Sequence, residues 1–542
     1  VNAQEGNTLP VSAFKDYVDG STPSGTAAYE KRGIAVDIPI WQSETCIQCN
    51  RCAYVCPHAV IRPVALTEEE VAQAPEGLKT LDMIGMPGMK FTMTVSAYDC
   101  TGCGSCVNVC PGKKNKETGE VEKALTMANM EANAGEQTFF DFGREIPVKP
   151  EVVAKFKETT VKGSQFKQPL LEFSGACAGC GETPYAKLIT QLFGDRMYIA
   201  NATGCSSIWG NSSPSTPYTV TPEGKGPAWS NSLFEDNAEF GYGMLLAQNT
   251  IRDRLKAKVE KIAEKTTDEA VKAAAAEYLE TYTVGATNGT ATDKLVAALE
   301  ALDCDCEERA EVLKNKDFLA KKSQWIFGGD GWAYDIGYGG VDHVLASKKD
   351  INIMVFDTEV YSNTGGQSSK ATKTGATAQF AAGGKETKKK DLAGMAMTYG
   401  YVYVAQIAMG ADFNQTVKAI AEAEAYPGPS LIIAYAPCIN HGIKKGMSKA
   451  QTEEQLAVEC GYWNNFRYNP AAEGDKFSLD SKAPKAEGYQ DFLNGEVRYN
   501  ALKRANPAKA DKLFALNEQE AMERYDYLNK LVTVYAAEKE DK

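Results

Sequence analysis

The sequence predicts a parallel α/β domain with helices on both faces of its sheet, joined to a smaller α+β domain whose cysteines bind metal. From about residue 170 onwards, short apolar runs alternate with helix-like or Gly-rich segments. By contrast, eight of the 15 cysteines lie in two compact runs before residue 112. A chain of 542 residues is also too long for one ordinary domain.

The alternating part contains five strand-like runs, at 197–200, 325–327, 351–356, 401–407 and 430–436. Regular alternation of strands with helices is typical of a parallel sheet. We expect an arm or linker over 1–40, a metal-binding domain over 41–165 and the α/β domain over 166–455. Residues 244–323 are rich in Ala, Lys, Glu and Leu and predict a helical insertion. Residues 456–542 have few strand signals and are expected to form an extension ending in a helix over 518–538.

Net charge, apolar runs and cysteine clustering exclude several classes of function for this chain. The net charge of −13 argues against nucleic acid as the main partner. The sequence contains no run of about eighteen apolar residues, so it predicts no membrane span. Clustered thiols in an enzyme-sized chain indicate metal sites rather than disulfides, so we expect a reducing, cytoplasmic and anaerobic setting.

The two cysteine runs each have the pattern Cys-x-x-Cys-x-x-Cys-x-x-x-Cys-Pro, at 46–57 and 100–111. This spacing is typical of bacterial-ferredoxin-like domains with two [4Fe–4S] clusters, in which the fourth cysteine of each run binds the other cluster. The first cluster is therefore assigned to Cys46, Cys49, Cys52 and Cys110, and the second to Cys56, Cys100, Cys103 and Cys106. Zinc sites are the alternative, but they generally use two separated Cys-x-x-Cys pairs. Between the runs, Thr67 and Glu70 predict a capping box at a helix start.

Further cysteines lie in the α/β part. Cys177 and Cys180 form a Cys-x-x-Cys pair, and Cys205 and Cys438 each follow an apolar run. The spacing leaves a redox-active pair, a structural pair and a shared cluster open. We expect free thiols at Cys304, Cys306 and Cys460, and ordinary structural roles for His58 and His441.

A Gly-Asp-Gly turn at 329–331 follows one strand, and the oxygen-rich turn 357–367 follows the next. This arrangement resembles the thiamine diphosphate motif. Glycines allow backbone N–H groups to approach a diphosphate, and Asp330 offers Mg²⁺ a hard carboxylate ligand. The usual motif closes with an Asn pair, whereas this chain has Asp357-Thr358. A Thr358 oxygen and the Val360 carbonyl are then the expected further Mg²⁺ ligands.

Taken together, these motifs resemble the C-terminal half of the pyruvate:ferredoxin (flavodoxin) oxidoreductases, in the 2-oxoacid:ferredoxin oxidoreductase family. The segments that carry the resemblance are 46–52, 177–184, 202–206, 328–337, 361–367 and 436–442. The resemblance implies that Cys177, Cys180, Cys205 and Cys438 hold a third [4Fe–4S] cluster beside the thiamine. It also implies Asn363 and Cys205 as catalytic residues. The implied cofactor-binding residues are Thr203, Gly204, Cys205, Ser206, Gly329, Asp330, Gly331, Trp332, Thr358, Val360, Tyr361, Ser362, Asn363 and Thr364.

The activity implied by the resemblance is CoA-dependent oxidative decarboxylation of pyruvate to acetyl-CoA, with electrons passed through three clusters to ferredoxin or flavodoxin. Another 2-oxoacid as substrate (2-oxoglutarate, an aryl pyruvate or oxalate) and a purely electron-transferring subunit are the alternatives. In this family the Glu that activates thiamine lies on a pyrimidine-binding domain, which we do not find in these residues. We therefore expect one portion or subunit of a larger, homodimeric enzyme that is inactive alone.

Overall fold

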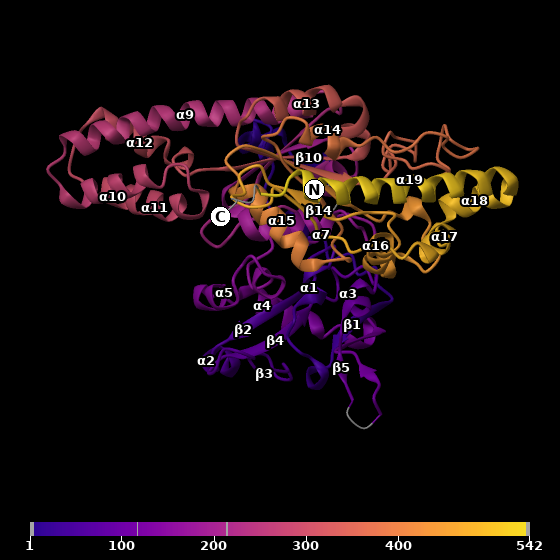
Figure 1. The fold of residues 1–542 in the computed structure, drawn as a ribbon. Coiled ribbons are helices and arrows are strands. Elements are labelled where there is room, and N and C mark those ends of the chain that lie inside the picture. Colours follow the sequence, from indigo (N-terminus) through magenta and orange to yellow (C-terminus); the bar gives the residue numbers. More distant parts are fainter. Residues whose placement is uncertain (1–4, 116–117, 213–214, 538–542) are drawn as a thin grey trace, which may run out of the picture.

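The computed structural model describes residues 5–115, 118–212 and 215–537. An eight-stranded sheet lies at its centre, in the order β15-β14-β12-β13-β11-β10-β8-β9 (Figure 1). The strands are β8 (Met197–Ala202), β9 (Ala228–Ser232), β10 (Ser323–Gly329), β11 (Ile351–Asp357), β12 (Tyr403–Ile407), β13 (Pro429–Tyr435), β14 (Phe466–Tyr468) and β15 (Phe477–Leu479). The six strands from β12 to β9 are parallel, which confirms the predicted α/β fold.

The antiparallel strands β14 and β15 extend one edge, so the complete sheet is mixed. The sequence does not predict these two strands, because three residues are too few to show a two-residue period. It also misses β9 at the opposite edge, whose residues are mostly polar.

Successive residues of a strand point to opposite faces of the sheet. In β11, Ile353 and Val355 pack into one core, whereas Met354 and Phe356 pack into the other. The first core is covered by α9 (Asn237–Lys265), α13 (Tyr338–Ala346), α14 (Leu392–Met397) and α19 (Pro507–Val534). The second is covered by α7 (Thr183–Phe193) and α15 (Phe413–Ala425). Burial on both faces explains why these strands read as continuous apolar runs.

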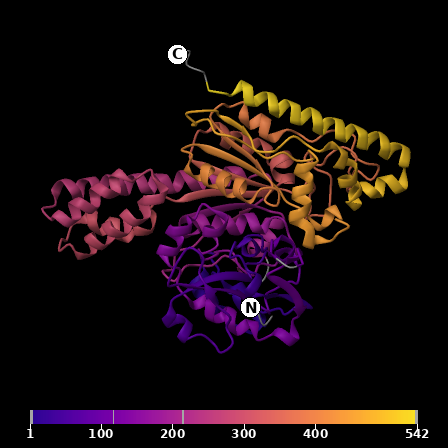
Figure 2. The ribbon, with the colours of Figure 1, turned by 60° about the horizontal axis from the view of Figure 1, so that its bottom comes forward.

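A helical arm leaves the sheet between β9 and β10. It comprises most of α9 together with α10 (Glu269–Glu280), α11 (Gly285–Ala301) and α12 (Glu307–Lys314), and it projects to the left in Figures 1 and 2. Buried side chains such as Leu255, Val271 and Leu295 form a core of its own. The predicted helical region is therefore present as a separately packed arm.

The smaller domain lies below the sheet in Figure 2. Its strands are β1 (Asp37–Trp41), β2 (Ile61–Leu66), β3 (Leu81–Asp82), β4 (Lys90–Val95), β5 (Lys113–Lys114), β6 (Val121–Glu122) and β7 (Leu125–Asn129). Its helices are α1 (Arg51–Tyr54), α2 (Glu68–Ala72), α3 (Ser105–Val109), α4 (Glu136–Glu145), α5 (Pro150–Phe156) and α6 (Val161–Ser164). The capping box predicted at α2 is confirmed: Thr67 Oγ1 accepts from the Glu70 N–H, and Glu70 Oε2 accepts from the Thr67 N–H.

The smaller domain is docked on the face of the sheet that α7 and α15 cover. Tyr54 and Val55 belong to the same buried core as α7, and the Tyr54 hydroxyl donates to the Phe413 carbonyl at 3.1 Å. The buried ammonium of Lys187 donates to the carbonyls of Ala53 and Tyr54. These contacts hold the α1 cysteine loop against the larger domain.

The last part of the chain contributes α16 (Ala450–Glu459), α17 (Tyr489–Asn494), α18 (Val497–Ala505) and α19. The terminal helix begins at Pro507, earlier than predicted, because Asn506 caps it and Pro is well suited to a first helical position. Among the described residues, no helix combines the length and apolar character needed to cross a bilayer.

The helical arm offers a stability test. We expect Leu295→Ala to lower the free energy of unfolding of the arm by about 2–5 kcal/mol, since Leu295 is fully buried in its core. Hydrogen exchange of the α10 and α11 amides measures this change. Leu246→Ala on the exposed side of α9 is the control, expected within about 0.5 kcal/mol of the parent. Equal effects of the two variants would contradict a separate arm core.

Candidate functional site

The parallel strands end at one edge of the sheet, and their loops build a common site there. Strand β8 leads into 203–206, β10 into Asp330, β11 into 358–364 and β13 into Cys438. A cavity between the first three of these loops is lined by Glu182, Gly204, Cys205, Ser206, Phe234, Gly329, Asp330, Gly331, Trp332, Thr358, Val360, Tyr361, Ser362, Asn363 and Thr364. Only one predicted cofactor-binding residue is absent from this lining. The Thr203 hydroxyl instead donates a hydrogen bond to the Ser232 carbonyl oxygen, with an Oγ1–O distance of 2.8 Å.

The lining also contains Glu182 and Phe234, which sequence reasoning missed. Glu182 stands two residues after Cys180, in a segment whose clearest sequence signal is its pair of cysteines. Its carboxylate accepts from the Trp209 indole N–H at 2.7 Å, and burial raises its pKa to about 7. Phe234 carries no chemical signal of its own in the sequence.

The three predicted Mg²⁺ ligands converge at the end of the cavity. Thr358 Oγ1 lies 3.0 Å from Asp330 Oδ1 and 3.0 Å from the Val360 carbonyl oxygen. The other Asp330 oxygen accepts from Ser369 Oγ at 2.5 Å. A carboxylate, a hydroxyl and a carbonyl oxygen form the hard donor set that Mg²⁺ prefers.

Charge at this end of the cavity also suits a cation. Lys389 Nζ lies 2.7 Å from Asp357 Oδ2 and 3.2 Å from Glu359 Oε1, so these buried carboxylates are paired. Asp330 forms no ion pair within the part of the chain that the structure describes. Burial, followed by the negative charge of Asp357, raises the pKa of Asp330 to about 8. A bound cation would supply the positive charge that the ionised form of this carboxyl needs.

The glycine positions fit a diphosphate. A Cβ atom added to Gly204 or Gly329 would make only an ordinary van der Waals contact, at 3.8 Å from Phe234 or from the Phe356 carbonyl oxygen, so neither glycine is crowded by other residues. Uncrowded glycines in a lining let the backbone come close to phosphate oxygens, although the Gly204 N–H itself donates to Ser207 Oγ at 2.9 Å. The cavity residues therefore fit a diphosphate held through Mg²⁺.

The four cysteines predicted for the first cluster line one small cavity. Cys46, Cys49 and Cys52 meet Cys110 there, although Cys110 belongs to the second run. The crossed assignment of the fourth cysteine is thus compatible with the geometry.

The second predicted set is more deeply buried. Burial and then the neighbouring thiols of Cys103 and Cys56 raise the pKa of Cys106. Burial raises the pKa of Cys100 to about 12, with Cys56 and Cys103 adding to the effect. Thiols with pKa values raised in this way stay protonated at neutral pH and become thiolates when a metal binds them.

The third set is assembled from three loops. Glu182 lies close to Cys180, Cys205 and Cys438, and Cys177 neighbours Cys438. Among the described residues, no group of three or more His, Cys, Asp or Glu side chains is arranged for a single metal ion. A cubane differs from such a site because each of its four thiolates binds a separate iron.

The remaining cysteines and histidines are structural. The expectation of free thiols is wrong for Cys304 and Cys306, which form a disulfide in the link between α11 and α12. Their Cα atoms are 5.5 Å apart, which is close enough for the bond. Cys460 is free and buried. Burial lowers the pKa of His58 to about 4 and that of His441 to about 3. Their Nε2 atoms contact the carbonyls of Ala176 and Thr358.

Comparison with known proteins agrees with this architecture. Three family models match: EKR, a domain of unknown function, over residues 1–35; the 4Fe-4S dicluster domain over 45–114; and the C-terminal TPP binding domain of thiamine pyrophosphate enzymes over 313–434. The chain is 56% identical to the pyruvate:ferredoxin oxidoreductase of Moorella thermoacetica and 54% identical to the pyruvate-flavodoxin oxidoreductase of Enterobacter agglomerans. Each alignment covers 98% of this chain.

The chain belongs to the pyruvate:ferredoxin (flavodoxin) oxidoreductase family. The resemblance inferred from the motifs is confirmed. Another relative is the mitochondrial pyruvate dehydrogenase [NADP(+)] of Euglena gracilis, 47% identical over 94% of this chain. The chain spans 45% of the length of the Moorella and Enterobacter oxidoreductases and 28% of the Euglena protein.

The crossed cysteine assignment can be tested by iron content. We expect Cys110→Ala to lose the first cluster, so that iron falls from about twelve to about eight atoms per chain. Metal analysis and electron paramagnetic resonance of anaerobically reconstituted protein measure this loss. Cys460→Ala removes another buried thiol and should retain all the iron. An unchanged iron content in Cys110→Ala would refute the assignment.

The metal end of the cavity can be tested separately. We expect Asp330→Asn to weaken Mg²⁺-dependent binding of thiamine diphosphate by at least about tenfold, or about 1.4 kcal/mol, because a charged ligand is lost. Isothermal titration calorimetry measures the affinity. Asp335→Asn is the matched control, since Asp335 pairs with Lys370 outside the cavity. A loss of equal size in both variants would point to a general charge effect.

Proposed function

We propose that this chain supplies the diphosphate-binding half of a thiamine active site and the electron relay for CoA-dependent oxidative decarboxylation of pyruvate. The observation that carries the proposal is the position of Cys205. This residue lines the thiamine cavity and also neighbours Cys180 and Cys438 of the third set. A cluster held by these cysteines would share a wall with the cofactor, so an electron leaving the active site would have a short path.

When bound, thiamine diphosphate supplies a nucleophilic carbon and an electron sink for a 2-oxoacid. Asp330, Thr358 and the Val360 carbonyl would hold Mg²⁺, and the uncrowded backbones at Gly204 and Gly329 would receive the diphosphate. Asn363 is exposed at the cavity, where its amide can bond to the substrate. The part of the site that recognises the substrate would come from a further domain or subunit.

The cysteine sets suggest an order for the relay. Gly179, in the Cys177–Cys180 loop, lies beside Cys103 of the second set. Cys52 of the first set lies near Cys106 of the second. Electrons would therefore pass from the third cluster to the second and then to the first, with ferredoxin or flavodoxin as acceptor.

The first cluster would be the outlet because its loop reaches the surface. Ile47, between Cys46 and Cys49, is 45% exposed. Lys162 lies near both cysteines and donates to the Ile84 carbonyl at 3.4 Å. An apolar centre with a cation at its rim suits docking of an acidic electron carrier.

Two observations would separate this proposal from its alternatives. We expect the isolated chain to bind one thiamine diphosphate. When this loaded chain is given pyruvate, it should reduce no viologen. Absence of thiamine binding would favour a subunit that only transfers electrons, whereas pyruvate-dependent turnover by the isolated chain would show that no further domain is needed. In the assembled enzyme, the ratio of kcat/KM for pyruvate and 2-oxoglutarate decides the substrate.

The outlet can be tested without the rest of the enzyme. We expect Lys162→Glu to slow oxidation of the dithionite-reduced chain by flavodoxin at least about tenfold at low salt, because the charge change repels an acidic carrier. Stopped-flow absorbance measures the rate. Oxidation by a small viologen should stay unchanged, and Lys256→Glu on the distant α9 serves as the control. Equal slowing with the viologen would indicate damage to the cluster instead of lost docking.

A further inference from the structure

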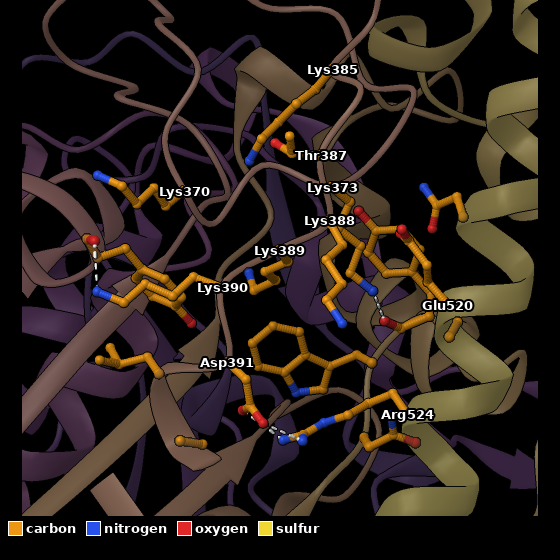
Figure 3. A pocket seen from close by; sticks show the side chains of 18 of the residues that line it. Lys370, Lys373, Lys385, Thr387, Lys388, Lys389, Lys390, Asp391, Glu520 and Arg524 are labelled. Carbon is orange, nitrogen blue, oxygen red and sulfur yellow. Dashed lines mark hydrogen bonds and ion pairs between the residues drawn. The ribbon is translucent and has the colours of Figure 1, made fainter. Parts of the chain in front are cut away.

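A second cavity, of about 800 Å³, lies between the loop 368–391 and helix α19 (Figure 3). Lys370, Lys373, Lys385, Lys388, Lys389, Lys390 and Arg524 line it, together with the acidic residues Asp335, Asp391, Glu520 and Glu523. It adjoins the proposed metal site through Ser369, whose hydroxyl donates to Asp330. Cavities of this volume hold small-molecule ligands and cofactors.

Three of the cations have carboxylate partners. Lys370 pairs with Asp335 at 2.8 Å and Lys389 with Asp357 at 2.7 Å. Arg524 pairs with Asp391, as Figure 3 shows. Glu520 accepts instead from the Thr374 hydroxyl at 2.7 Å. Asp335, Asp357 and Asp391 are thus paired, whereas Glu520 and Glu523 form no ion pair within the described residues.

Four lysines have no such partner. Lys373 donates to the Tyr462 carbonyl, Lys385 to those of Ser369 and Thr372, and Lys390 to that of Tyr334. Lys388 is exposed at the cavity. Within the described residues none of the four has a carboxylate oxygen in ion-pair reach. Carbonyl oxygens orient an ammonium group but do not neutralise its charge.

Burial reinforces this imbalance. Burial is the main cause that lowers the pKa values of Lys373, Lys385 and Lys390, each to about 8. Nearby cations add to the effect: Lys389 beside Lys373 and Lys385, and Lys370 beside Lys390. Four lysines without a carboxylate partner outnumber the two unpaired glutamates of the lining, and this excess of positive charge suits an anion.

The cavity also offers aromatic surfaces. Trp463, Tyr334 and Tyr527 line it. Trp463 is 2% exposed, and its Nε1–H has no acceptor among the described residues. Tyr334 is equally buried, whereas Tyr527 is 48% exposed and is the ring on which a flat heterocycle can stack, as bases do on aromatic side chains. Inorganic phosphate would use the cations but would leave most of the volume and these rings without contacts.

We propose that this cavity binds the diphosphate or triphosphate of a nucleotide, with Lys373, Lys385, Lys388 and Lys390 contacting the phosphates. The base would lie against the aromatic wall. The ligand is a free adenine nucleotide or the nucleotide end of a larger cofactor, because both present the same phosphates. The site does not depend on the proposed pyruvate chemistry, and it is separate from the cavity at Asp330.

Calorimetry on the reconstituted chain tests this site. The protein is first saturated with Mg²⁺ and thiamine diphosphate, so that the cavity at Asp330 is filled, and is then titrated with ADP, ATP, CoA or pyrophosphate. We expect one nucleotide per chain. Tighter binding of CoA than of ADP identifies the nucleotide end of a cofactor, and equal or tighter binding of the free nucleotides identifies those as the ligand.

The matched variants are Lys388→Gln and the double variant Lys385→Gln/Lys388→Gln, with Lys256→Gln on α9 as the control. We expect the double variant to raise the nucleotide Kd at least about tenfold, equal to about 1.4 kcal/mol. Thiamine diphosphate affinity should stay unchanged in Lys388→Gln, whose side chain is exposed. No binding of any probe overturns the proposal. An equal Kd in the variants and the control also overturns it, as does pyrophosphate binding as tight as that of ADP.

Discussion

Four parallel strands, β8, β10, β11 and β13, end at the same edge of the sheet, and the loops that follow them build the site. Parallel pairing requires this convergence, because each crossover returns the chain to the opposite edge before the next strand begins. Asp330 and Thr358, nearly thirty residues apart, therefore come within hydrogen-bonding distance. Cys205 and Cys438 are brought together in the same way from opposite ends of the domain. The thiamine cavity and the third cysteine set are thus consequences of one topology.

The segment 177–182 connects the two functions. Cys180 faces the cysteine set, and Glu182, two residues later, lines the thiamine cavity. Its buried carboxyl stands beside Cys205, which belongs to both groups. Packing of the smaller domain against α7 places the second cysteine set next to this segment. The separation between the candidate thiamine site and the second cysteine set is therefore determined by a contact between domains.

The loop after β11 has two sides with different electrostatics. Towards the cavity it presents Thr358 and Val360, whose oxygens suit a cation. On the other side it carries the lysine-rich stretch 385–390, which suits an anion. Lys389 lies between them and pairs with the buried carboxylates of Asp357 and Glu359, the second of which also pairs with Arg498. One surface loop can support both environments only because these ion pairs separate them.

The sequence by itself determined the features that depend on short spacing. The two cysteine runs, the Gly-Asp-Gly turn, the capping box at Thr67 and the apolar strands all lie within windows of about a dozen residues, where local geometry constrains the choice of side chain. The tertiary structure alone decided the rest. Phe234 enters the cavity from a segment with no motif, and Glu182 enters it from a motif recognised by its cysteines. Strands β9, β14 and β15 exist only by pairing with neighbours. Cys304 and Cys306 pair through the shape of a link between helices, and the lysine cavity needs α19 as its far wall. These features depend on groups far apart in the chain, and it is the pairing of strands and the packing of helices that bring such groups together.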